Sequence, residues 1–484
     1  MFRNLRSYAL DASIHTIAHG RLPAGWGERR MGTIGAFTAS GIDKKLVDGE
    51  PQVRIVNYLD VFRNQSHTLT RRHEYMSVTC PEWKRVAHQV KRGDLIFTPS
   101  SETAEEIGRS AVALEDLDNT AYSYHVLRFR PSVRIDADFA RFWCNHTAFY
   151  DQLAAASIGT TRKILSRGDF RNVLVVVPPH EDQRAIAKYL GHAHARIDRA
   201  IAAKRKLIAL LEEQKQAIIH QAVTRGLDPT VPLKDSGIPG LGEIPAHWST
   251  VPLKHLARFK SGAGFPVSEQ GRAGNAIPFF RVSDMNAPGN GQWLYMTDSS
   301  VTPDDARRLG AYVFPEGSIV FPKVGGALLT NKRRRLAQAS CVDNNVMAAI
   351  LPAGEGGDYV NLVLSRVDLG KYVNPGPVPA IGEGQVGRIR VAMPPSSEQR
   401  SILELVGTST STIVMAQDRA RDEIELLREF RTRLTSDVVT GQVDVREIAD
   451  TLPELTDDML ANTSDDAVDT VLEDVEDFTE GEDD

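Results

Sequence analysis

The sequence has few cysteines and no long apolar run, and each shortage excludes a class of protein. Its three cysteines, Cys80, Cys144 and Cys341, are odd in number and form no Cys-x-x-Cys pair, which argues against a disulfide framework and against a zinc site. No run of eighteen apolar residues is present, so the sequence predicts no membrane span. The first residues lead into no apolar stretch of the kind that marks an export signal. Together these absences predict a protein of the cytoplasm.

Basic residues are missing from the end of the chain. From Glu447 to Asp484 there are 16 acidic residues and no Lys or Arg, whereas residues 1–446 carry 57 basic and 47 acidic side chains. The net charge of −6 therefore hides a body with a surplus of 10 positive charges. A basic body suits a polyanionic partner such as nucleic acid, although an ordinary solvated surface would carry similar charges. Dense charge with few aromatics predicts that residues 446–484 form a disordered acidic tail.

The clearest feature that is present is a long internal repeat. Residues 178–184, PPHEDQR, match residues 394–400, PPSSEQR, at an offset of 216, and the match continues without a gap for about fifty residues. Upstream, the Pro-x-x-Trp pattern that ends at Trp26 occurs again and ends at Trp248, and the changing offsets indicate insertions and deletions in loops. The order is therefore variable module, conserved helix, variable module, conserved helix. It predicts two similar halves related by a pseudo-twofold axis.

Each conserved segment predicts a long helix, the first from residue 181 to about residue 224. Apolar residues recur at spacings of three, four or seven among good helix formers, a pattern typical of a coiled-coil seam. The seam residues are Ile186, Leu190, Ile197, Ile208 and Leu211 in the first copy and Ile402, Ile413, Ile424 and Leu427 in the second.

The connectivity of the repeat predicts how these helices pair. The second module begins where the first helix ends, and the second helix begins where that module ends, so the pair is expected to be antiparallel. About 45 residues at roughly 1.5 Å each give about 65 Å, on the order of twenty base pairs of DNA. Such a rod is suited to act as a molecular ruler, and the alternative is a plain scaffold or dimerisation rod.

The two variable modules predict α+β domains. Short β-like runs alternate with Gly and Pro clusters, and one helix is predicted at residues 137–152. The predicted strands lie at residues 53–56, 95–97, 123–127 and 173–177 of the first module and at residues 277–280, 318–321 and 346–350 of the second.

Basic and amide residues gather in the predicted loops of both modules. Arg and Lys bind phosphates and guanine edges, and Asn and Gln bind adenine edges. Each cluster alone is about as typical of a solvated loop, but several clusters within a duplicated architecture favour DNA binding. The candidate DNA-binding residues are Arg71, Arg72, Lys91, Arg92, Thr160, Thr161, Arg162, Lys163, Lys332, Arg333, Arg334, Arg335, Asn344 and Asn345.

No motif of the sequence indicates catalysis. It contains neither a Walker A motif nor the Asn-Pro-Pro-aromatic motif of amino-methyltransferases. Residues 382–387 fit Gly-x-Gly-x-x-Gly, but they precede a β-like run instead of following a strand and opening a helix. His192 and His194 share a helix but not a face, so a solvated pair is the simpler interpretation. We therefore predict no catalytic residue, no metal site and no cofactor bound by this chain.

The conserved segments resemble those of the specificity subunits of type I restriction–modification systems, over nearly the whole chain except the acidic tail. The resemblance lies in residues 177–190, VPPHEDQRAIAKYL, residues 210–215, LLEEQK, residues 222–228, AVTRGLD, and residues 235–248 at the opening of the second module. The sequence departs from the family pattern at Asp182, where Glu is usual. It also departs in the second helix, where residues 408–412 are rich in Ser and Thr and Gly441-Gln442 replaces Arg225-Gly226.

The resemblance implies a non-catalytic subunit with two target-recognition domains, each of which reads one half of a bipartite site in double-stranded DNA. The helices then set the gap and dock two modification (methyltransferase) subunits through the seam residues. S-adenosylmethionine is expected on those subunits, and ATP with Mg²⁺ on the restriction (motor-nuclease) subunit. The alternatives are a coiled-coil scaffold without DNA specificity and an enzyme with unrecognised motifs. The implied domains are an N-terminal segment (1–19), target-recognition domain 1 (20–178), the central spacer (179–228), target-recognition domain 2 (229–394), the distal spacer (395–445) and the acidic tail (446–484).

Overall fold

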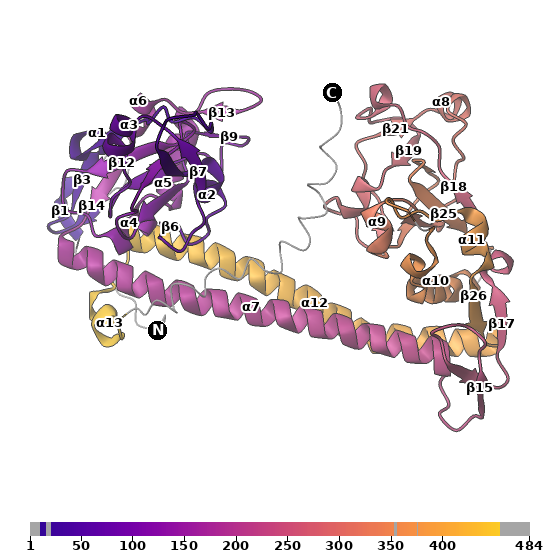
Figure 1. Cartoon of the computed structure of the whole chain (residues 1–484). Coiled ribbons are helices and arrows are strands. Elements are labelled where there is room, and N and C mark those ends of the chain that lie inside the picture. The colour runs from indigo at the N-terminus through magenta and orange to yellow at the C-terminus, as the bar shows by residue number, and fades with distance from the viewer. Residues whose placement is uncertain (1–9, 16–20, 353–355, 375, 455–484) are drawn as a thin grey trace. The chain divides into compact units, whose positions relative to one another are not determined.

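The computed structural model describes residues 10–15, 21–352, 356–374 and 376–454 and divides the chain into two compact units (Figure 1). Among these residues, unit 1 comprises the chain up to Lys206 and again from Ala420, and unit 2 comprises Leu207–Arg419. Each unit contains one module of mixed helices and strands together with part of two long helices. The fold is therefore α+β.

A five-stranded sheet forms the centre of the module in unit 1. Its order is β4-β12-β8-β10-β6, and every neighbouring pair is antiparallel except the parallel pair of β10 and β6. A second sheet of order β11-β5-β7 pairs β11 with β5 in parallel and β5 with β7 antiparallel. These strands are β4 (Gly35–Thr38), β5 (Gln52–Val56), β6 (Thr68–Leu69), β7 (Met76–Thr79), β8 (Leu95–Phe97), β10 (Ser110–Ala113), β11 (Thr120–Tyr122) and β12 (Leu127–Pro131).

Strand β8 shows how the sequence places the core of this module. Leu95, Ile96 and Phe97 are all fully buried, although successive side chains of a strand point to opposite faces of the sheet. Leu95 and Phe97 pack into the larger core with Phe37 and Phe129, whereas Ile96 packs into a separate cluster. The strand is covered on both faces, which explains why the run is apolar without alternation.

Short helices and two-stranded pairs complete the module of unit 1. The helix expected at residues 137–152 is two helices, because the chain leaves the helical conformation at residues 144–146. The strand expected at residues 123–127 is wrong over residues 123–126, which form the turn between β11 and β12 of two different sheets. The remaining elements are α1 (Met31–Ile34), α2 (Tyr58–Phe62), α3 (Glu82–Ala87), α4 (Ala137–Trp143), α5 (Thr147–Ala156), α6 (Arg167–Asn172), and the pairs β1 (Leu10–His15) with β2 (Arg21–Pro23), β3 (Gly27–Arg30) with β14 (Leu174–Val177), and β9 (Ser100–Ser101) with β13 (Lys163–Ile164).

The module of unit 2 has the same strand order. Its five-stranded sheet runs β18-β25-β22-β23-β20, again with one parallel pair at the end, between β20 and β23. The three-stranded sheet β21-β19-β24 pairs β19 with β24 in parallel and with β21 antiparallel. These strands are β18 (Arg258–Ser261), β19 (Ile277–Phe280), β20 (Trp293–Leu294), β21 (Ser300–Val301), β22 (Ile319–Pro322), β23 (Arg334–Leu336), β24 (Cys341–Val342) and β25 (Val346–Ile350).

Two strand pairs and several short helices surround this second sheet. The pair β17 and β26 is antiparallel, as are β3 and β14 in unit 1. The elements are β15 (Leu233–Asp235) paired with β16 (Glu243–Pro245), β17 (Ser249–Pro252) paired with β26 (Arg390–Met393), α8 (Pro303–Arg308), α9 (Gly326–Leu329), α10 (Gly356–Arg366), α11 (Glu383–Arg388), and the 3₁₀ turns η1 (Leu253–His255), η2 (Val267–Glu269), η3 (Ser283–Asn286) and η4 (Leu369–Tyr372).

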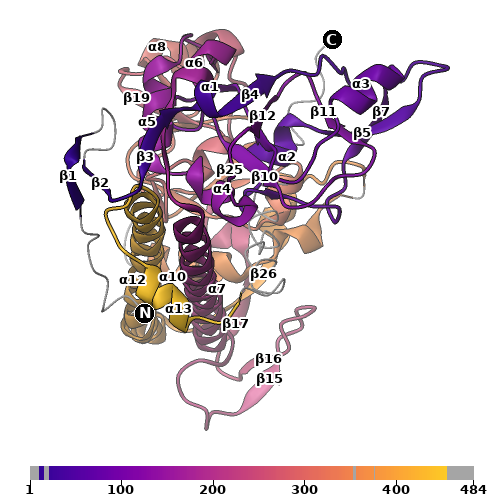
Figure 2. The same cartoon turned by 90° about the vertical axis from the view of Figure 1, so that its left-hand side faces the viewer.

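Two long helices, α7 (His180–Arg225) and α12 (Ser396–Val439), contribute to both units. In unit 1 they run antiparallel, since His194 contacts Thr435 and Asp198 contacts Arg431 further along, and Figure 2 shows them side by side. In unit 2, Gln417 of α12 contacts Ile208 of α7. Among the described residues, no helix has the length and apolar character that crossing a membrane requires.

The Ser/Thr-rich stretch at residues 408–412 does not interrupt α12. The Thr408 hydroxyl donates to the Glu404 carbonyl at 2.8 Å, and the Thr410 hydroxyl donates to the Val406 carbonyl at 2.7 Å. Hydroxyls that bond one turn back compete less with the helical backbone for its donors. The stretch is held in the helix by tertiary packing, since Val406 and Ile413 on either side of it are buried.

The end of the described chain differs from the expected acidic tail. Residues 446–451 form helix α13 (Arg446–Thr451), and Val445 and Ala449 are buried in the larger core of unit 1. These apolar contacts outweigh the acidic composition, so the predicted start of the tail at residue 446 is too early. Residues 455–484 of the predicted tail lie outside the described residues, as do residues 1–9 and 16–19 of the predicted N-terminal segment.

In unit 1, a tryptophan joins the module to both long helices. The Trp26 indole N–H donates to the Asp182 carboxylate, in the first turn of α7, at 2.7 Å. Just past the end of α12, Gly441 has a left-handed φ of +78° and lies so close that a Cβ there would meet Pro23 Cδ at 2.6 Å and Trp26 at 2.9 Å. We name Pro23, Trp26, Asp182 and Gly441 the Trp junction of unit 1.

Unit 2 contains a Trp junction of the same kind. The Trp248 indole N–H donates to the Glu398 carboxylate, in the first turn of α12, at 3.1 Å. Gly226, just past the end of α7, has a φ of +70°, and a Cβ there would meet Glu398 at 2.8 Å and Trp248 at 3.2 Å. The residues are Pro245, Trp248, Glu398 and Gly226. The replacement of Arg225-Gly226 by Gly441-Gln442 therefore moves the left-handed glycine by one position along the repeat without removing it.

Candidate nucleic-acid interface

In unit 1, the loop that precedes β13 presents one predicted cluster, Thr160 to Lys163. Thr160, Thr161 and Arg162 are exposed. The Arg162 Nε donates to the Ser100 hydroxyl at 3.2 Å, and its guanidinium lies 5.8 Å from the centre of the Tyr58 ring. A guanidinium that lies over an aromatic ring in an exposed loop can donate hydrogen bonds to either a phosphate or a base edge.

The other predicted residues of unit 1 lie against an acidic turn. Arg71 pairs with Asp118 at 3.1 Å and with Glu115 at 3.4 Å. The backbone N–H of Arg92 donates to the Asp116 carboxylate at 2.8 Å. All four residues of this group, Arg71, Arg72, Lys91 and Arg92, are exposed. Because Glu115 and Asp118 pair with Arg71, the local potential that this arginine offers to a phosphate is weaker than its exposure implies.

In unit 2, the run of cations at Lys332–Arg335 is largely occupied inside its own module. Lys332 bonds to the Asn286 side chain, and Arg334 donates to the Met285 carbonyl at 3.2 Å. Arg335 pairs with Asp358 at 2.8 Å. Arg333 donates to the Val367 carbonyl at 2.8 Å, and burial lowers the pKa of its guanidinium to about 10. The densest basic cluster of the sequence therefore forms contacts between β23 and the rest of its module. Contact of this cluster with DNA stays a prediction.

The pair Asn344 and Asn345 is presented differently, in the turn between β24 and β25. Both residues are exposed. The backbone N–H of Asn345 donates to the Asp343 carboxylate at 3.0 Å, and its carbonyl accepts from the Lys323 N–H at 2.8 Å. Burial raises the pKa of Asp343 to about 6. A turn fixed by these contacts holds two exposed amides, the group that pairs with adenine edges.

The predicted seam residues lie between the helices or beneath the modules. Six of them are less than a tenth exposed, and the others, Ile208, Leu211 and Leu427, are partly buried. Their side chains therefore pack within this chain, and partner docking through them stays a prediction. A different set of apolar side chains on the same helices is exposed, namely Leu207, Leu210, Leu405, Val414, Met415, Leu426 and Phe430.

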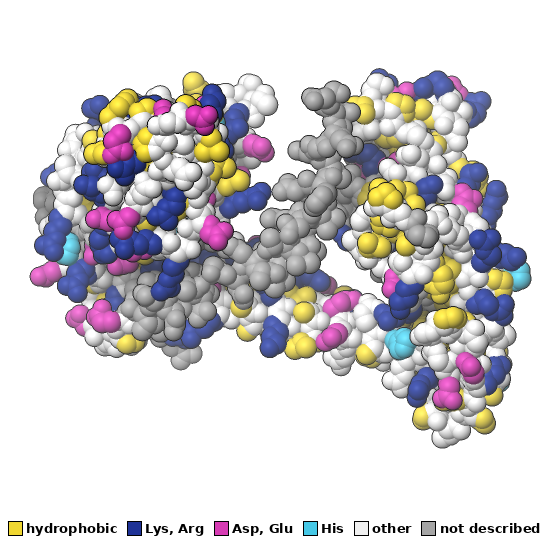
Figure 3. Space-filling view, in the orientation of Figure 1, with side chains coloured by type: hydrophobic (Ala, Val, Ile, Leu, Met, Phe, Trp, Pro, Cys, Tyr) yellow, Lys and Arg dark blue, Asp and Glu magenta, His cyan; other side chains and the backbone are white. Residues whose placement is uncertain are grey.

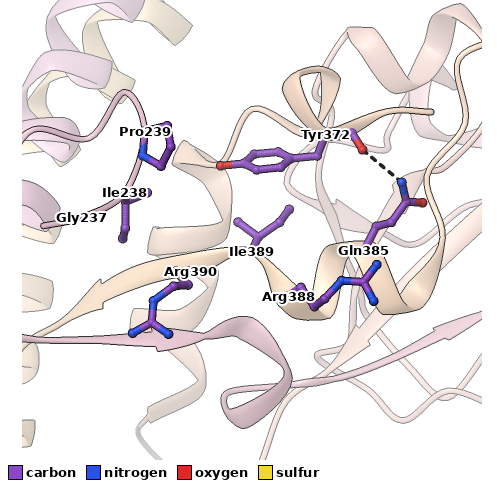
Figure 4. Close-up of a pocket in the computed structure, with 8 residues that line it drawn as sticks. All are labelled: Gly237, Ile238, Pro239, Tyr372, Gln385, Arg388, Ile389 and Arg390. Carbon is purple, nitrogen blue, oxygen red and sulfur yellow. Dashed lines mark hydrogen bonds between the residues drawn. The ribbon is translucent and has the colours of Figure 1, made fainter. Parts of the chain in front are cut away.

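A small open pocket of about 360 Å³ lies in unit 2 between a loop and the end of α11 (Figure 4). Gly237, Ile238 and Pro239 form one side, and Arg388 lies on the opposite side, at the end of α11. Arg390 lies nearer the loop, and both arginines are exposed. The glycine-rich motif at residues 382–387 does open a helix, α11, contrary to expectation, but the helix is only six residues long. The described lining combines apolar side chains with two cations and includes no carboxylate, imidazole or thiol.

The two helix histidines have structural partners in unit 1. His192 Nε2 lies 2.8 Å from the Pro453 carbonyl, and His194 Nε2 lies 2.8 Å from the Thr435 hydroxyl. Across the described residues, no group of three or more His, Cys, Asp or Glu side chains could hold a metal ion.

Sequence reasoning missed a polar cleft of about 500 Å³ in unit 1, between the module and the long helices. Its lining includes Arg141, which the sequence places on a helix among Phe139, Phe142 and Trp143. A single arginine in an aromatic helix was the available signal, but the burial of that arginine depends on which surface packs against it. Arg141 is 6% exposed.

Charged side chains on one face of each unit are distributed rather than gathered in one patch. On the face drawn in Figure 3, Lys and Arg side chains are scattered over each unit, and acidic side chains lie among them in unit 1. Phosphate contact at such a surface would depend on individual well-placed cations.

No family model matches the chain. In sequence it is similar to the type I restriction enzyme MjaVIII specificity subunit of Methanocaldococcus jannaschii, with 23% identity over 61% of this chain and 68% of that one. It is also similar to a second protein of that organism, the putative type I restriction enzyme MjaX specificity subunit, with 22% identity over 73% of this chain and 79% of that one. The fold is similar to that of a chain solved to explain complex assembly and conformational transition of the type I restriction–modification system. The TM-score is 0.58 at 17% identity, and the match covers 87% of this chain and 99% of that chain.

Proposed function

We propose that this chain is the DNA-specificity subunit of a type I restriction–modification system. The observation that carries the proposal is the duplicated module: two sheets of the same strand order, each joined to the long helices by a Trp junction. A duplicated reader is suited to a DNA site with two parts. The similarity to two specificity subunits over most of the chain supports the same function.

In this proposal each module reads one half of a bipartite site. The exposed Arg162 loop is the leading candidate in unit 1, and the exposed Asn344–Asn345 turn is the leading candidate in unit 2. Arginine contacts phosphates and guanine, and the two amides contact adenine. The antiparallel helix pair, paired as a coiled coil within a pseudo-twofold repeat, sets the gap between the half-sites.

The same proposal assigns the exposed apolar side chains of α7 and α12 to partner docking. Leu210, Met415 and Leu426 are each more than half exposed, which is costly for a helix face that stays in water. Two modification subunits would each cover one part of this face, as a repeated chain predicts. They would carry S-adenosylmethionine, and a motor subunit would carry ATP with Mg²⁺, so that this chain itself performs no chemistry.

The test is adenine methylation across the host genome, read by single-molecule sequencing with and without the gene. We expect one bipartite motif with a fixed unspecified gap to lose methylation when the gene is absent. If no motif changes and the purified chain, together with the neighbouring methyltransferase, shows no sequence preference, the proposal is wrong.

Single residues sharpen this test. Replacing both Asn344 and Asn345 with Ala should relax only one half of the motif, because each lost base contact is worth about 1–3 kcal/mol of discrimination. Arg162→Ala should affect only the other half. Arg171→Ala on α6, an exposed arginine outside the predicted clusters, is the control and should leave the motif unchanged.

A further inference from the structure

The cleft in unit 1 brings the module and the long helices together around a group of arginines. It lies between the loop at residues 64–67, helix α4 with the start of α5, and the facing sides of α7 and α12. Figure 2 shows α4 above α7. Four arginines line the cleft, Arg109, Arg141, Arg428 and Arg431, against two carboxylates, Glu105 and Asp198. The lining is otherwise rich in amide, hydroxyl and imidazole groups, so it is suited to a polar ligand.

Arg141 is unlike the other three arginines of the cleft. Arg109 pairs with Glu106 at 3.0 Å, Arg428 with Glu425 at 2.8 Å, and Arg431 with Asp198 at 2.8 Å. The Nε and Nη2 nitrogens of Arg141 are buried and have no hydrogen-bond partner among the described residues.

The surroundings of Arg141 provide little compensation for its charge. Its guanidinium lies 4.5 Å from the centre of the Phe142 ring. Burial lowers its pKa to about 10, and the charge of Asp138 opposes that shift only in part. A buried cation without a hydrogen-bonded counterion costs several kcal/mol. Proteins seldom keep such a group unless something else meets it.

Two of the three histidines that line the cleft, His67 and His194, also indicate a positive local potential. Burial, followed by the charges of Arg431 and Arg141, holds the pKa of His194 well below its usual value. Burial lowers the pKa of His67 to about 4, and nearby arginine charges act in the same direction. Both imidazoles are therefore neutral at pH 7 and do not add to the charge, and a negative group in the cleft would be stabilised by the arginines.

We propose that this cleft binds a phosphate group, with Arg141 as the buried cation that meets it. Arginine is the side chain best suited to a planar, two-pronged contact with phosphate oxygens. The phosphate has two sources with the same chemistry, free phosphate and the backbone of DNA.

A chain of contacts supports DNA as the source of the phosphate group. This part of the inference rests on the proposed function. Arg109 of the cleft donates to the Phe62 carbonyl at 2.9 Å. The Phe62 ring stacks on Tyr58 with centroids 5.1 Å apart, and Arg162 lies over that same Tyr58 ring. The candidate recognition loop and the cleft are thus connected by contacts within unit 1, so that DNA bound at Arg162 is the phosphate source that these contacts favour.

Unit 2 supplies a natural contrast at the corresponding helix. Phe139 of α4 and Tyr359 of α10 are both fully buried, and each follows an acidic residue. Two positions further along, α4 has Arg141 and α10 has Asn361. The module of unit 2 therefore has no cation at the place where unit 1 buries one, and the proposal applies to unit 1 alone.

The first experiment titrates the full-length chain with sodium phosphate, using sodium chloride at matched ionic strength as the reference. At about a tenfold excess over the dissociation constant, we expect the unfolding midpoint to rise by about 2–4 °C. Arg141→Met keeps an apolar stem against Phe142 and should abolish the rise. In phosphate-free buffer, this variant should unfold at a higher temperature than the wild type, because it no longer buries an unpaired charge.

Two control variants test whether the response to phosphate depends on the cleft or on a general loss of a polar side chain. Asn361→Met changes the corresponding position of unit 2, and Arg433→Met removes an arginine of α12 that is 82% exposed and does not line the cleft. Both should respond to phosphate as the wild type does. If Arg141→Met does not fold, Arg141→Lys replaces it, and this variant should bind phosphate about tenfold more weakly because lysine lacks the two-pronged contact.

A parallel titration with duplex DNA distinguishes the two sources. A DNA source predicts that Arg141→Met weakens binding to every duplex sequence alike and lowers the salt dependence by about one phosphate contact. A free-phosphate source predicts unchanged DNA affinity with loss of the phosphate-induced stabilisation. If the wild type and Arg141→Met respond equally to phosphate and to DNA, the proposal is wrong. Because the phosphate titration requires no DNA specificity, its outcome is independent of the methylation test.

Discussion

The two Trp junctions have the same design but differ in how the chain supplies their parts. In unit 2, Gly226 precedes Trp248 by a short segment of the same chain. In unit 1, Gly441 comes from the far end of the sequence and packs against Trp26 without any covalent link nearby. The close contact at the glycine and the indole bond to a carboxylate occur in both. The junction therefore depends on complementary side chains, not on chain continuity, and the two versions can be tested against each other.

The largest expected effect comes from removing either tryptophan. Trp26→Ala and Trp248→Ala should each lower the free energy of unfolding by about 3–5 kcal/mol, because both indoles are almost fully buried. Urea denaturation would measure the loss. Replacement by Phe should affect the two junctions differently. In unit 2, Glu398 also lies 2.8 Å from the His247 ring, so its carboxylate keeps a partner after the indole N–H is lost. Trp26→Phe should thus cost more than Trp248→Phe, and equal losses would contradict the difference between the junctions.

The next effect concerns the two left-handed glycines. Both glycines have a left-handed φ, which costs an alanine on the order of 1 kcal/mol in either junction. Gly441→Ala should destabilise the chain by about 2–3 kcal/mol, since its Cβ would in addition strike the rigid Pro23 ring. Gly226→Ala should cost only about 1 kcal/mol, because its nearest obstacle is the flexible end of Glu398. Denaturation of both variants under the same conditions would show which substitution lowers the free energy of unfolding more. A larger loss for Gly226→Ala would refute the steric argument.

Acid should have effects of opposite sign at two buried groups, His67 in unit 1 and Asp343 in unit 2. The pKa of His67 in unit 1 is lowered from 6.5 to about 4, so the unfolded state binds a proton first and stability falls as the pH drops from 6.5 toward 4. The effect on the unfolding equilibrium is about tenfold per pH unit. The pKa of Asp343 in unit 2 is raised to about 6, so the folded state binds the proton first, and stability rises below pH 6. Amide hydrogen exchange at pH 7.0 and 5.5, corrected for intrinsic exchange rates, would test both directions. From pH 7.0 to 5.5, protection should fall in β10 and rise in β24.

One variant can show whether His67 causes the loss of stability in acid in unit 1. His67→Asn removes the titrating group, and asparagine tolerates the left-handed φ of 55° found there. The variant should reduce the loss of protection in β10 at pH 5.5 and leave β24 unchanged. Equal loss in the variant and the wild type would mean that His67 is not the responsible group.

The smallest effect concerns the polar contacts between the long helices. In unit 1, Lys204 pairs with Glu423, whereas in unit 2 the buried Gln417 donates to the Glu212 carboxylate at 3.1 Å. Lys204→Met should lower the free energy of unfolding by only about 0.2–1 kcal/mol, and 1 M NaCl should remove the difference. The loss in Gln417→Met should persist in salt. A salt-insensitive loss for Lys204→Met would show that its apolar stem matters more than its charge.

The long helices and most strands could be predicted because their signals are local and periodic. The first helix was expected at residues 181–224 and extends over His180–Arg225, since apolar spacing and the flanking Pro and Gly determine both ends. The prediction failed at residues 123–126, where β-prone residues form a turn between two sheets. Propensity describes the residues of that run, but only the tertiary fold determines where one sheet ends and the next begins.

Charged residues were harder to predict than strands. The run at Lys332–Arg335 has the composition of a DNA-binding loop, yet Arg333 is directed into its own module and bonds to the Val367 carbonyl. Arg141 has no neighbouring cation in the sequence and is buried beside the long helices. Composition reports how many cations a segment has. Whether each of them faces solvent depends on packing between segments that are far apart in the chain.

The last turns of α12 and helix α13 complete the core of unit 1, and this has a consequence for how the protein is made. Leu434, Val438 and Ala449 belong to the same core as Trp26 and Phe129. The described residues of unit 2 all lie within one stretch of the chain, Leu207–Arg419, and can fold as soon as that stretch leaves the ribosome. The first module must wait with part of its apolar core open until translation is almost finished. A premature stop after residue 419 would therefore damage the domain that was synthesised first.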